Sequence, residues 1–286
     1  MKISDLYKNK KTVFSLEVFP PKKTDSIDSI YSTLDGLKEV SPDFISVTYG
    51  AGGNVADNKT RMIAEVIKKE YGIESMAHLT CVSTSNEDAG LILDDFSSHG
   101  IENILALRGD ISPDRPPKDD FRYASDLATF IREHGSFDIG GACYPEGHAE
   151  AKDRTTDIAN LKKKVDAGVS FLITQLFFDN DYFFRFAERA KGAGIDVPVS
   201  AGIMPVTNKR QIERMVTMCG ASIPRKLARL MSKYSDDPAS LTEAGIEYAA
   251  AQIEGLIRGG VDGIHLYTMN NPDVAGRIYS GVKELL

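Results

Sequence analysis

The sequence predicts an α/β protein folded as a (β/α)8 barrel (TIM barrel), with extra helices before the last strand. Three observations predict this fold. Eight short apolar segments recur along the chain, amphipathic segments separate them, and the whole pattern fits within 286 residues. Eight strand-then-helix units in a chain of this length match the count and size of such a barrel. An open doubly wound sheet is the alternative, but eight units are many for it.

The candidate strands are rich in β-branched and aromatic residues and are mostly apolar along their whole length. Such runs are typical of parallel strands that are covered on both faces. The predicted strands are Thr12–Phe19, Asp43–Tyr49, Glu74–Cys81, Asn103–Leu107, Asp138–Tyr144, Phe171–Phe177, Val197–Ile203 and Gly263–Thr268.

The segments between the strands have helical spacing of apolar residues, and Asn86 and Asp157 lie near helix starts, as N-capping residues do. Between Ser222 and Leu256, Pro224 and a Ser-Asp-Asp-Pro turn predict the extra helices. With no linker or composition shift, residues 1–286 are expected to form one domain. The predicted helices are Ser26–Val40, Asn58–Glu70, Asn86–His99, Ala124–His134, Thr155–Ala167 and Asp181–Ala193.

Composition excludes several classes of protein. The net charge of −7 does not favour binding to nucleic acid or to an anionic membrane. No apolar run approaches membrane-spanning length, and the charged N-terminus has no signal-peptide core. Three cysteines without paired spacing fit a reducing compartment, and the five histidines form no zinc motif. These features predict a soluble cytoplasmic protein without a metal site.

Polar residues gather where the predicted strands end. Because the active sites of barrels form at the carboxyl ends of the strands, these residues are the candidate site. They are Glu17, Thr48-Tyr49-Gly50, His78-Leu79-Thr80, Arg108-Gly109-Asp110, Tyr144-Pro145-Glu146-Gly147-His148, Gln175 and Tyr267-Thr268-Met269-Asn270.

Glu17 stands between Leu16 and Val18 in an otherwise apolar strand. Burying a carboxylate is costly unless it is paired or protonated. Desolvation raises the pKa of a carboxyl group, which would make Glu17 a proton donor near neutral pH. An outward-facing or salt-bridged glutamate is the alternative, and residue chemistry alone leaves the two evenly balanced.

Three further motifs have weaker signals. Arg108-Gly109-Asp110 offers a forked donor beside a glycine that allows close approach to a ligand, although a surface turn explains it equally well. The run Lys162-Lys163-Lys164 suits a solvated helix face, with one lysine free to meet a pyrophosphate. Gly50-Ala51-Gly52-Gly53 fits neither the dinucleotide fingerprint nor the Walker pattern.

Taken together, these segments resemble the methylenetetrahydrofolate reductase family in its bacterial single-domain form. Each match is weak alone, but nine occur in order along nearly the whole chain. The matching segments are Phe14–Pro21, Phe44–Gly50, His78–Cys81, Ala106–Asp110, Tyr123–Leu127, Tyr144–His148, Lys164–Gly168, Ile173–Asp179 and Leu266–Asn270.

The resemblance implies an FAD-dependent reductase that converts 5,10-methylenetetrahydrofolate to 5-methyltetrahydrofolate with NAD(P)H. FAD accepts hydride from the nicotinamide, which leaves before folate binds in the same place. Glu17 would be the general acid, and Asp110 would lie near the flavin and folate rings. Gln175, Gln211 and Asp110 would contact substrate. The positions implied for the cofactor are Thr48, Tyr49, His78, Arg108, Gly109, Asp110, Tyr123, Ala124, Tyr144, His148, Ala151, Asp157, Asn160 and Lys164.

Two positions depart from the family pattern. Asn271 stands where well-known bacterial members have arginine, and Met215 stands where they have phenylalanine. The family also implies a homo-oligomer, and a chain that stops after the barrel is not expected to be inhibited by adenosylmethionine. The alternatives are another FAD barrel oxidoreductase, such as a proline-dehydrogenase-like enzyme, and a barrel that only binds folate or a nucleotide.

Overall fold

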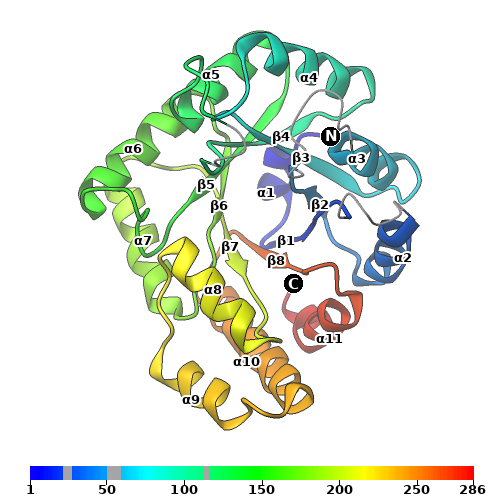
Figure 1. Ribbon diagram of the computed structural model, residues 1–286, viewed down its shortest axis with the longest axis vertical. Coiled ribbons are helices and arrows are strands. Elements are labelled where there is room, and N and C mark those ends of the chain that lie inside the picture. The colour runs from blue at the N-terminus through cyan, green and yellow to red at the C-terminus, as the bar shows by residue number, and fades with distance from the viewer. Residues whose placement is uncertain (22–27, 50–58, 112–115) are drawn as a thin grey trace.

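The computed structural model describes residues 1–21, 28–49, 59–111 and 116–286. Within these residues, eight parallel strands pair in chain order and the last pairs with the first, which closes the barrel. Figure 1 shows the strands as an inner ring with helices around it. The predicted (β/α)8 barrel is confirmed. The starts of two predicted helices, at Ser26 and Asn58, and the stretch Gly50–Gly53 lie outside the described residues.

Each predicted strand corresponds to an observed one. The main differences are at β2 and β6, which end before the polar residues that follow them, because the ladder pairing stops there. The strands are β1 Val13–Val18, β2 Phe44–Val47, β3 Glu74–Thr80, β4 Asn103–Leu107, β5 Asp138–Cys143, β6 Phe171–Thr174, β7 Val199–Ile203 and β8 Gly263–Tyr267.

The helices bury one apolar face against the barrel. In α4, for example, Ala89, Ile92, Leu93 and Phe96 recur at helical spacing and are all buried. The elements are η1 Ile3–Asp5, α1 Leu6–Asn9, α2 Asp28–Leu37, η2 Lys38–Val40, α3 Lys59–Lys69, α4 Asn86–Ser98, α5 Ala124–His134, α6 Arg154–Asp166, α7 Asn180–Gly192, α8 Lys209–Cys219, α9 Arg225–Lys233, α10 Pro238–Arg258, α11 Pro272–Val282 and η3 Lys283–Leu285.

Two details of the helices matter for the site. The extra helices predicted before the last strand are α9 and α10, which follow α8 between β7 and β8. The two predicted N-caps, Asn86 and Asp157, are wrong, because both residues lie within a helix, Asn86 in α4 and Asp157 in α6. Ser85 caps α4 and Asp153 caps α6, each accepting a bond from a backbone N–H in the first turn. Asp157 is therefore not used as a cap.

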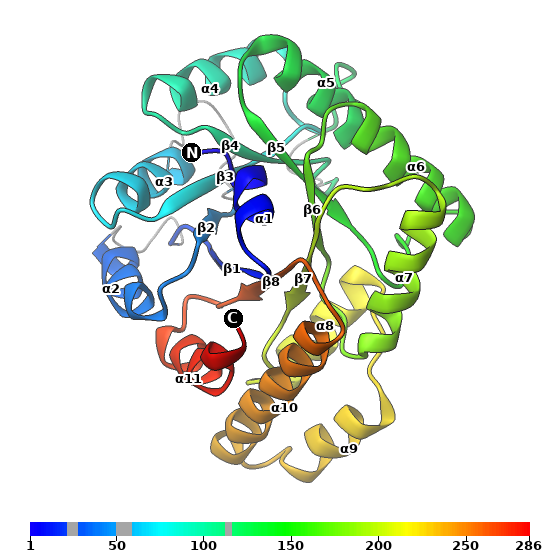
Figure 2. The same cartoon turned by 180° about the vertical axis from the view of Figure 1, so that it is seen from behind.

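The N-terminal segment closes the end of the barrel where the strands begin. Ile3 is fully buried in the inner core with Val13, Phe44 and Met76. The hydroxyl groups of Tyr7 and Ser200 lie 2.8 Å apart. Figure 2 shows α1 lying across this opening. In the described residues, this end of the barrel is covered, and the carboxyl ends of the strands, where the polar residues were predicted to gather, form the other end.

Candidate active site

The side chains of β1 that point into the barrel change from apolar to polar along the strand. Since alternate residues face the same side of a strand, Val13, Ser15 and Glu17 of β1 all point inward. Val13 packs in the inner core, Ser15 contacts His265, and Glu17 lines a cavity of about 710 Å³ at the carboxyl end. We call this space the central cavity. The candidate residues that line it are Glu17, Thr48, Tyr49, His78, Thr80, Arg108, Gly109, Asp110, Tyr144, His148, Gln175, Met215, Tyr267 and Met269.

Glu17 lies on the floor of the central cavity between two imidazoles from distant strands. Its Oε2 atom is 3.5 Å from Nε2 of His78 and 3.6 Å from Nε2 of His265. The Glu17 side chain is 20% exposed, whereas the two histidines are almost fully buried. Glu17 is thus neither outward-facing nor paired with a lysine or arginine among the described residues, and it opens only toward the cavity.

The expected rise in the pKa of Glu17 is wrong for the protein without ligands. Burial does raise the pKa of this carboxyl group, but contacts with His265, His78 and the Ser46 hydroxyl outweigh burial and lower it. The sequence argument counted only desolvation, because the neighbours come from β2, β3 and β8. The lowered pKa favours the ionised form of Glu17 in the protein without ligands.

His265 contacts Glu17, and the sequence argument did not include it among the candidate residues. It is fully buried, and its Nδ1 atom lies 2.8 Å from the Ser15 hydroxyl, which fixes the ring beneath Glu17. Tyr267, two residues further along β8, lines the central cavity and donates a hydrogen bond of 2.7 Å to the carbonyl of Thr174. The available signal was the alternation on β8, which puts His265 and Tyr267 on the same inward face.

The lowered pKa of the buried His78 side chain predicts how the free energy of unfolding depends on pH in acid. Burial lowers the pKa of His78 to about 4, from an ordinary value of 6.5. Between these values the unfolded chain binds a proton that the folded protein excludes, so the free energy of unfolding falls as pH drops from 6.5 to 4. We expect a loss of roughly 2–3 kcal/mol at this site. Thermal unfolding across this range should be less acid-sensitive in His78→Gln, and identical slopes would contradict the prediction.

The rim residues after β8 hold the segment that follows Glu17. The Thr268 hydroxyl donates a 2.6 Å hydrogen bond to the carbonyl of Glu17. The side-chain amide of Asn270 accepts from the N–H of Phe19 and donates to its carbonyl. These bonds link the ends of β1 and β8, so the predicted rim residues Thr268 and Asn270 position Glu17 instead of facing a ligand.

The Arg108-Gly109-Asp110 motif lies on the wall of the central cavity, directly after β4. Gly109 has φ +83°, and an added Cβ would lie 2.9 Å from the Thr80 side chain, so only glycine fits here without strain. Asp110 is exposed and lines the cavity. The three residues of the motif therefore form part of the wall of the central cavity.

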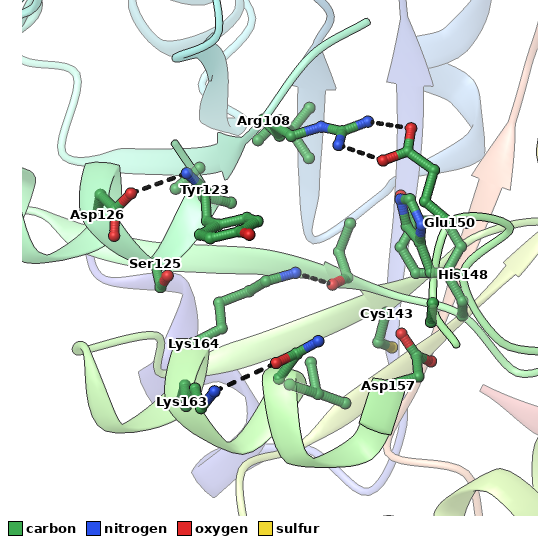
Figure 3. A pocket seen from close by; sticks show the side chains of 18 residues that line it. Arg108, Tyr123, Ser125, Asp126, Cys143, His148, Glu150, Asp157, Lys163 and Lys164 are labelled. Atoms are coloured by element: carbon green, nitrogen blue, oxygen red, sulfur yellow. Dashed lines mark hydrogen bonds and ion pairs between the residues drawn. The ribbon is translucent and has the colours of Figure 1, made fainter. Parts of the chain in front are cut away.

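A second cavity, of about 530 Å³, lies between the ends of β4 and β5 and the helices α5 and α6. We call it the side cavity, and Figure 3 shows its lining. The two cavities share Leu107, Arg108, Ala142, Tyr144 and His148, so they adjoin along this wall. The predicted cofactor residues that line the side cavity are Arg108, Tyr123, Ala124, Tyr144, His148, Ala151, Asp157, Asn160 and Lys164.

The three lysines of the run have different surroundings. Lys162 forms an ion pair with Asp166 on the outside of α6. Lys164 points into the side cavity, and its ammonium donates a 2.7 Å hydrogen bond to the carbonyl of Ala142 (Figure 3). Burial lowers the pKa of Lys164, partly offset by the charge of Asp157. Lys163 also borders the cavity but is exposed, so Lys164 is the half-buried lysine of the run that lines the side cavity.

Two residues that the family resemblance places near the substrate, Gln211 and Asn271, lie outside both cavities. Gln211, in the first turn of α8, lines neither cavity, although Met215 one turn later lines the central cavity. Asn271 caps α11 by accepting a hydrogen bond of 3.2 Å from the N–H of Val274. In the described residues Asn271 also lines neither cavity.

A second missed residue is Glu150, in the turn after β5. Its carboxylate accepts two hydrogen bonds, of 2.6 and 2.7 Å, from the terminal nitrogens of Arg108. Glu150 lines the side cavity next to the wall that both cavities share. The only signal in the sequence was its place two residues after His148.

The described residues contain no group of three or more histidine, cysteine, aspartate or glutamate side chains placed to hold a metal ion. Among the helices of the described residues, none is long and apolar enough to cross a membrane.

The fold and the site define a class: a (β/α)8 barrel protein with a carboxylate on the floor of one cavity and a half-buried cation in an adjoining one. The particular family is given by comparison with known proteins. The chain belongs to the methylenetetrahydrofolate reductase family, since the family model described as "Methylenetetrahydrofolate reductase" matches residues 2–283.

Individual relatives agree with this assignment. The chain is 39% identical to the 5,10-methylenetetrahydrofolate reductase of Pectobacterium carotovorum subsp. carotovorum, over 91% of this chain and 87% of the relative. Identity to the Escherichia coli (strain K12) protein of the same name is 38%, with the same coverage. A solved Clostridium thermocellum protein that binds two copies of 5-methyl-5,6,7,8-tetrahydrofolic acid covers 99% of this chain and all of its own, with TM-score 0.69 and 13% identity. That last likeness shows the fold alone.

Proposed function

We propose that this protein reduces 5,10-methylenetetrahydrofolate to 5-methyltetrahydrofolate with NAD(P)H, as a single catalytic FAD-binding domain. The observation that carries the proposal is the position of Glu17, the one acidic side chain on the floor of a cavity that adjoins a cation-bearing cavity among the described residues. The names of the relatives support the substrate. When bound, FAD supplies the two-electron chemistry that no side chain of the site can perform.

The residues present fit a dinucleotide. Each cavity has a volume within the range of about 300–1,000 Å³ that is typical of ligand sites, and the two share a wall. The half-buried ammonium of Lys164 and the guanidinium of Arg108 provide positive charge for a pyrophosphate. Gly109 leaves the wall of the central cavity free of a side chain, so that a flat ring can approach the backbone.

We assign roles to the candidate residues from the two cavities. Tyr123, Ala124, Ala151, Asp157 and Asn160 would hold the adenosine half in the side cavity. Arg108, His148 and Lys164 would hold the phosphates, with Tyr144 packed edge-on against His148. The flavin ring would occupy the central cavity, against the remaining residues Thr48, Tyr49, His78, Gly109 and Asp110.

Glu17 would donate the proton that opens the methylene bridge of the substrate. The group must first be protonated, and the direction of its pKa in the free protein opposes this. A folate ring over Glu17 would remove its remaining contact with water, and this desolvation strengthens the largest factor that already raises the pKa. Because the protonated form is the active one, the folate half-reaction should slow as pH rises.

Asp110 would stabilise the cationic iminium form of the substrate, since it is the carboxylate on the wall of the central cavity. Gln175, directly after β6, lines the same cavity and would bind substrate, whereas Gln211, which lines neither cavity, could reach substrate only from outside it. We expect Asp110→Asn to keep FAD bound while slowing folate reduction by about 10- to 100-fold, the scale of one lost charge interaction of 1.4–2.7 kcal/mol. Rapid-mixing kinetics of each half-reaction check this. Loss of flavin from the variant would contradict it.

The function is tested with the purified full chain. A yellow protein that releases FAD on denaturation and turns over methylenetetrahydrofolate with NADH or NADPH supports the proposal. A colourless protein without flavin would reject both flavin-dependent functions, the methylenetetrahydrofolate reductase and the proline-dehydrogenase-like enzyme. The remaining alternative would then be a barrel that only binds folate or a nucleotide. A flavoprotein that oxidises proline but not the folate supports the proline-dehydrogenase-like alternative. We further propose a cytoplasmic homo-oligomer, for which size-exclusion chromatography with light scattering gives the subunit number.

A further inference from the structure

The pair between Arg108 and Glu150 lies where the two cavities meet. Arg108 follows β4, and Glu150 lies in the turn between β5 and α6. Figure 3 shows the two side chains end to end above the other lining residues of the side cavity. Both terminal nitrogens of Arg108 are used by the two carboxylate oxygens of Glu150, at 2.6 and 2.7 Å. A ligand that runs from one cavity into the other must pass this pair.

The turn that carries Glu150 is itself well held. The N–H of Glu150 donates a 3.1 Å hydrogen bond to Nδ1 of His148, and the N–H of Ala151 donates to the His148 carbonyl. The backbone is therefore fixed next to a residue that lines both cavities. The Glu150 side chain, by contrast, is 62% exposed, whereas that of Arg108 is 26% exposed. The carboxylate can swing into solvent without moving the backbone.

A guanidinium fork that is already occupied by a carboxylate cannot bind a phosphate with the same two nitrogens, because both anions use the same paired donors. Phosphate and carboxylate thus compete for Arg108. Since the Glu150 carboxylate is mostly exposed, it loses little on returning to water, so the exchange is feasible.

We propose that Glu150 occupies the phosphate-binding fork of Arg108 in the empty protein and is displaced by the phosphates of the dinucleotide cofactor. This inference rests on the proposed function, because it needs a dinucleotide that spans both cavities. Glu150 then acts against cofactor binding: it keeps Arg108 paired while the site is empty and lowers the affinity for the dinucleotide. It does not touch the reacting atoms.

The expected effect follows from the strength of the pair. A well-formed pair at a partly exposed site is worth about 1 kcal/mol, which corresponds to roughly a fivefold change in an equilibrium constant. Glu150→Gln should therefore bind FAD about three- to tenfold more tightly than the wild type. A purely structural role, in which Glu150 holds Arg108 ready for the ligand, predicts the opposite sign.

The test measures the affinity of the full chain for FAD. The protein is first freed of flavin and is then titrated with FAD while flavin fluorescence is followed. The variants are Glu150→Gln and Glu150→Ala, with Glu243→Gln as the matched control. Glu243 also forms a two-bond pair with an arginine, Arg277, and both residues lie on the outer helices α10 and α11. Tighter binding in both Glu150 variants, with no change in the control, is the expected result.

A double-mutant cycle separates exchange at Arg108 from a general effect of charge. If Glu150 acts by occupying Arg108, then Glu150→Gln has no further effect in an Arg108→Gln background. Tightening of the same size in that background overturns the proposal, as does unchanged or weaker binding in both single variants. If the wild-type protein does not bind FAD at all, the proposed function itself is rejected. The two results that overturn the role of Glu150 do not affect the proposed function.

Discussion

Replacing Glu17 with glutamine is expected to lower the rate of folate reduction by about 10²- to 10⁴-fold, the usual contribution of a general acid. Reduction of the flavin by NAD(P)H should remain nearly unchanged, because hydride transfer from nicotinamide needs no proton from this side chain. Glutamine keeps the size of the residue on the cavity floor but has no acidic proton. Stopped-flow absorbance of the flavin measures the two half-reactions separately.

The control for this variant is Glu146→Gln. Glu146 also follows a strand end, but it lines neither cavity, and its carboxylate accepts a hydrogen bond of 2.9 Å from the N–H of Ser222. This control should reduce folate at the wild-type rate. Equal loss of both half-reactions in Glu17→Gln would show that Glu17 holds the site together through His78 and His265 and is not the acid.

Replacing Lys164 with methionine is expected to weaken FAD binding by about 10- to 100-fold. A hydrogen bond to a charged group contributes about 1.5–3 kcal/mol, and this ammonium is a half-buried cation that points into the side cavity. Methionine fills a similar volume without charge, so the cavity should keep its shape. Flavin content after purification and titration of the flavin-free chain with FAD give the affinity.

The matched control is Lys162→Met, two residues earlier on α6. Lys162 pairs with Asp166 and lines neither cavity, so its loss should leave FAD affinity unchanged. Thermal unfolding of the flavin-free variants shows whether Lys164→Met still folds. Weakening of the same size in both lysine variants would mean that net charge, and not a defined contact in the side cavity, governs the affinity.

The fold was largely predictable because the signals for it are local. Apolar runs and helical spacing are properties of short segments, and eight apolar runs separated by amphipathic segments leave few possible arrangements of the chain. The errors were at the ends of elements. For example, Asp157 was predicted as a cap but lies inside α6, because Asp153 caps that helix and α6 begins at Arg154. The strand-end rule also placed Glu17, Thr48, His78, Arg108 and Gln175 together on the central cavity.

By itself, the sequence determined that a barrel forms, which residues lie at its open end, and which family the matching segments resemble. Only the tertiary structure decided which partners these residues meet. It brought His78 and His265 to Glu17, reversing the expected direction of its pKa. It also brought Glu150 to Arg108, across 42 positions of the chain. The physical reason is that electrostatic interactions depend on distance in space, and closing the barrel puts residues side by side that are far apart in sequence.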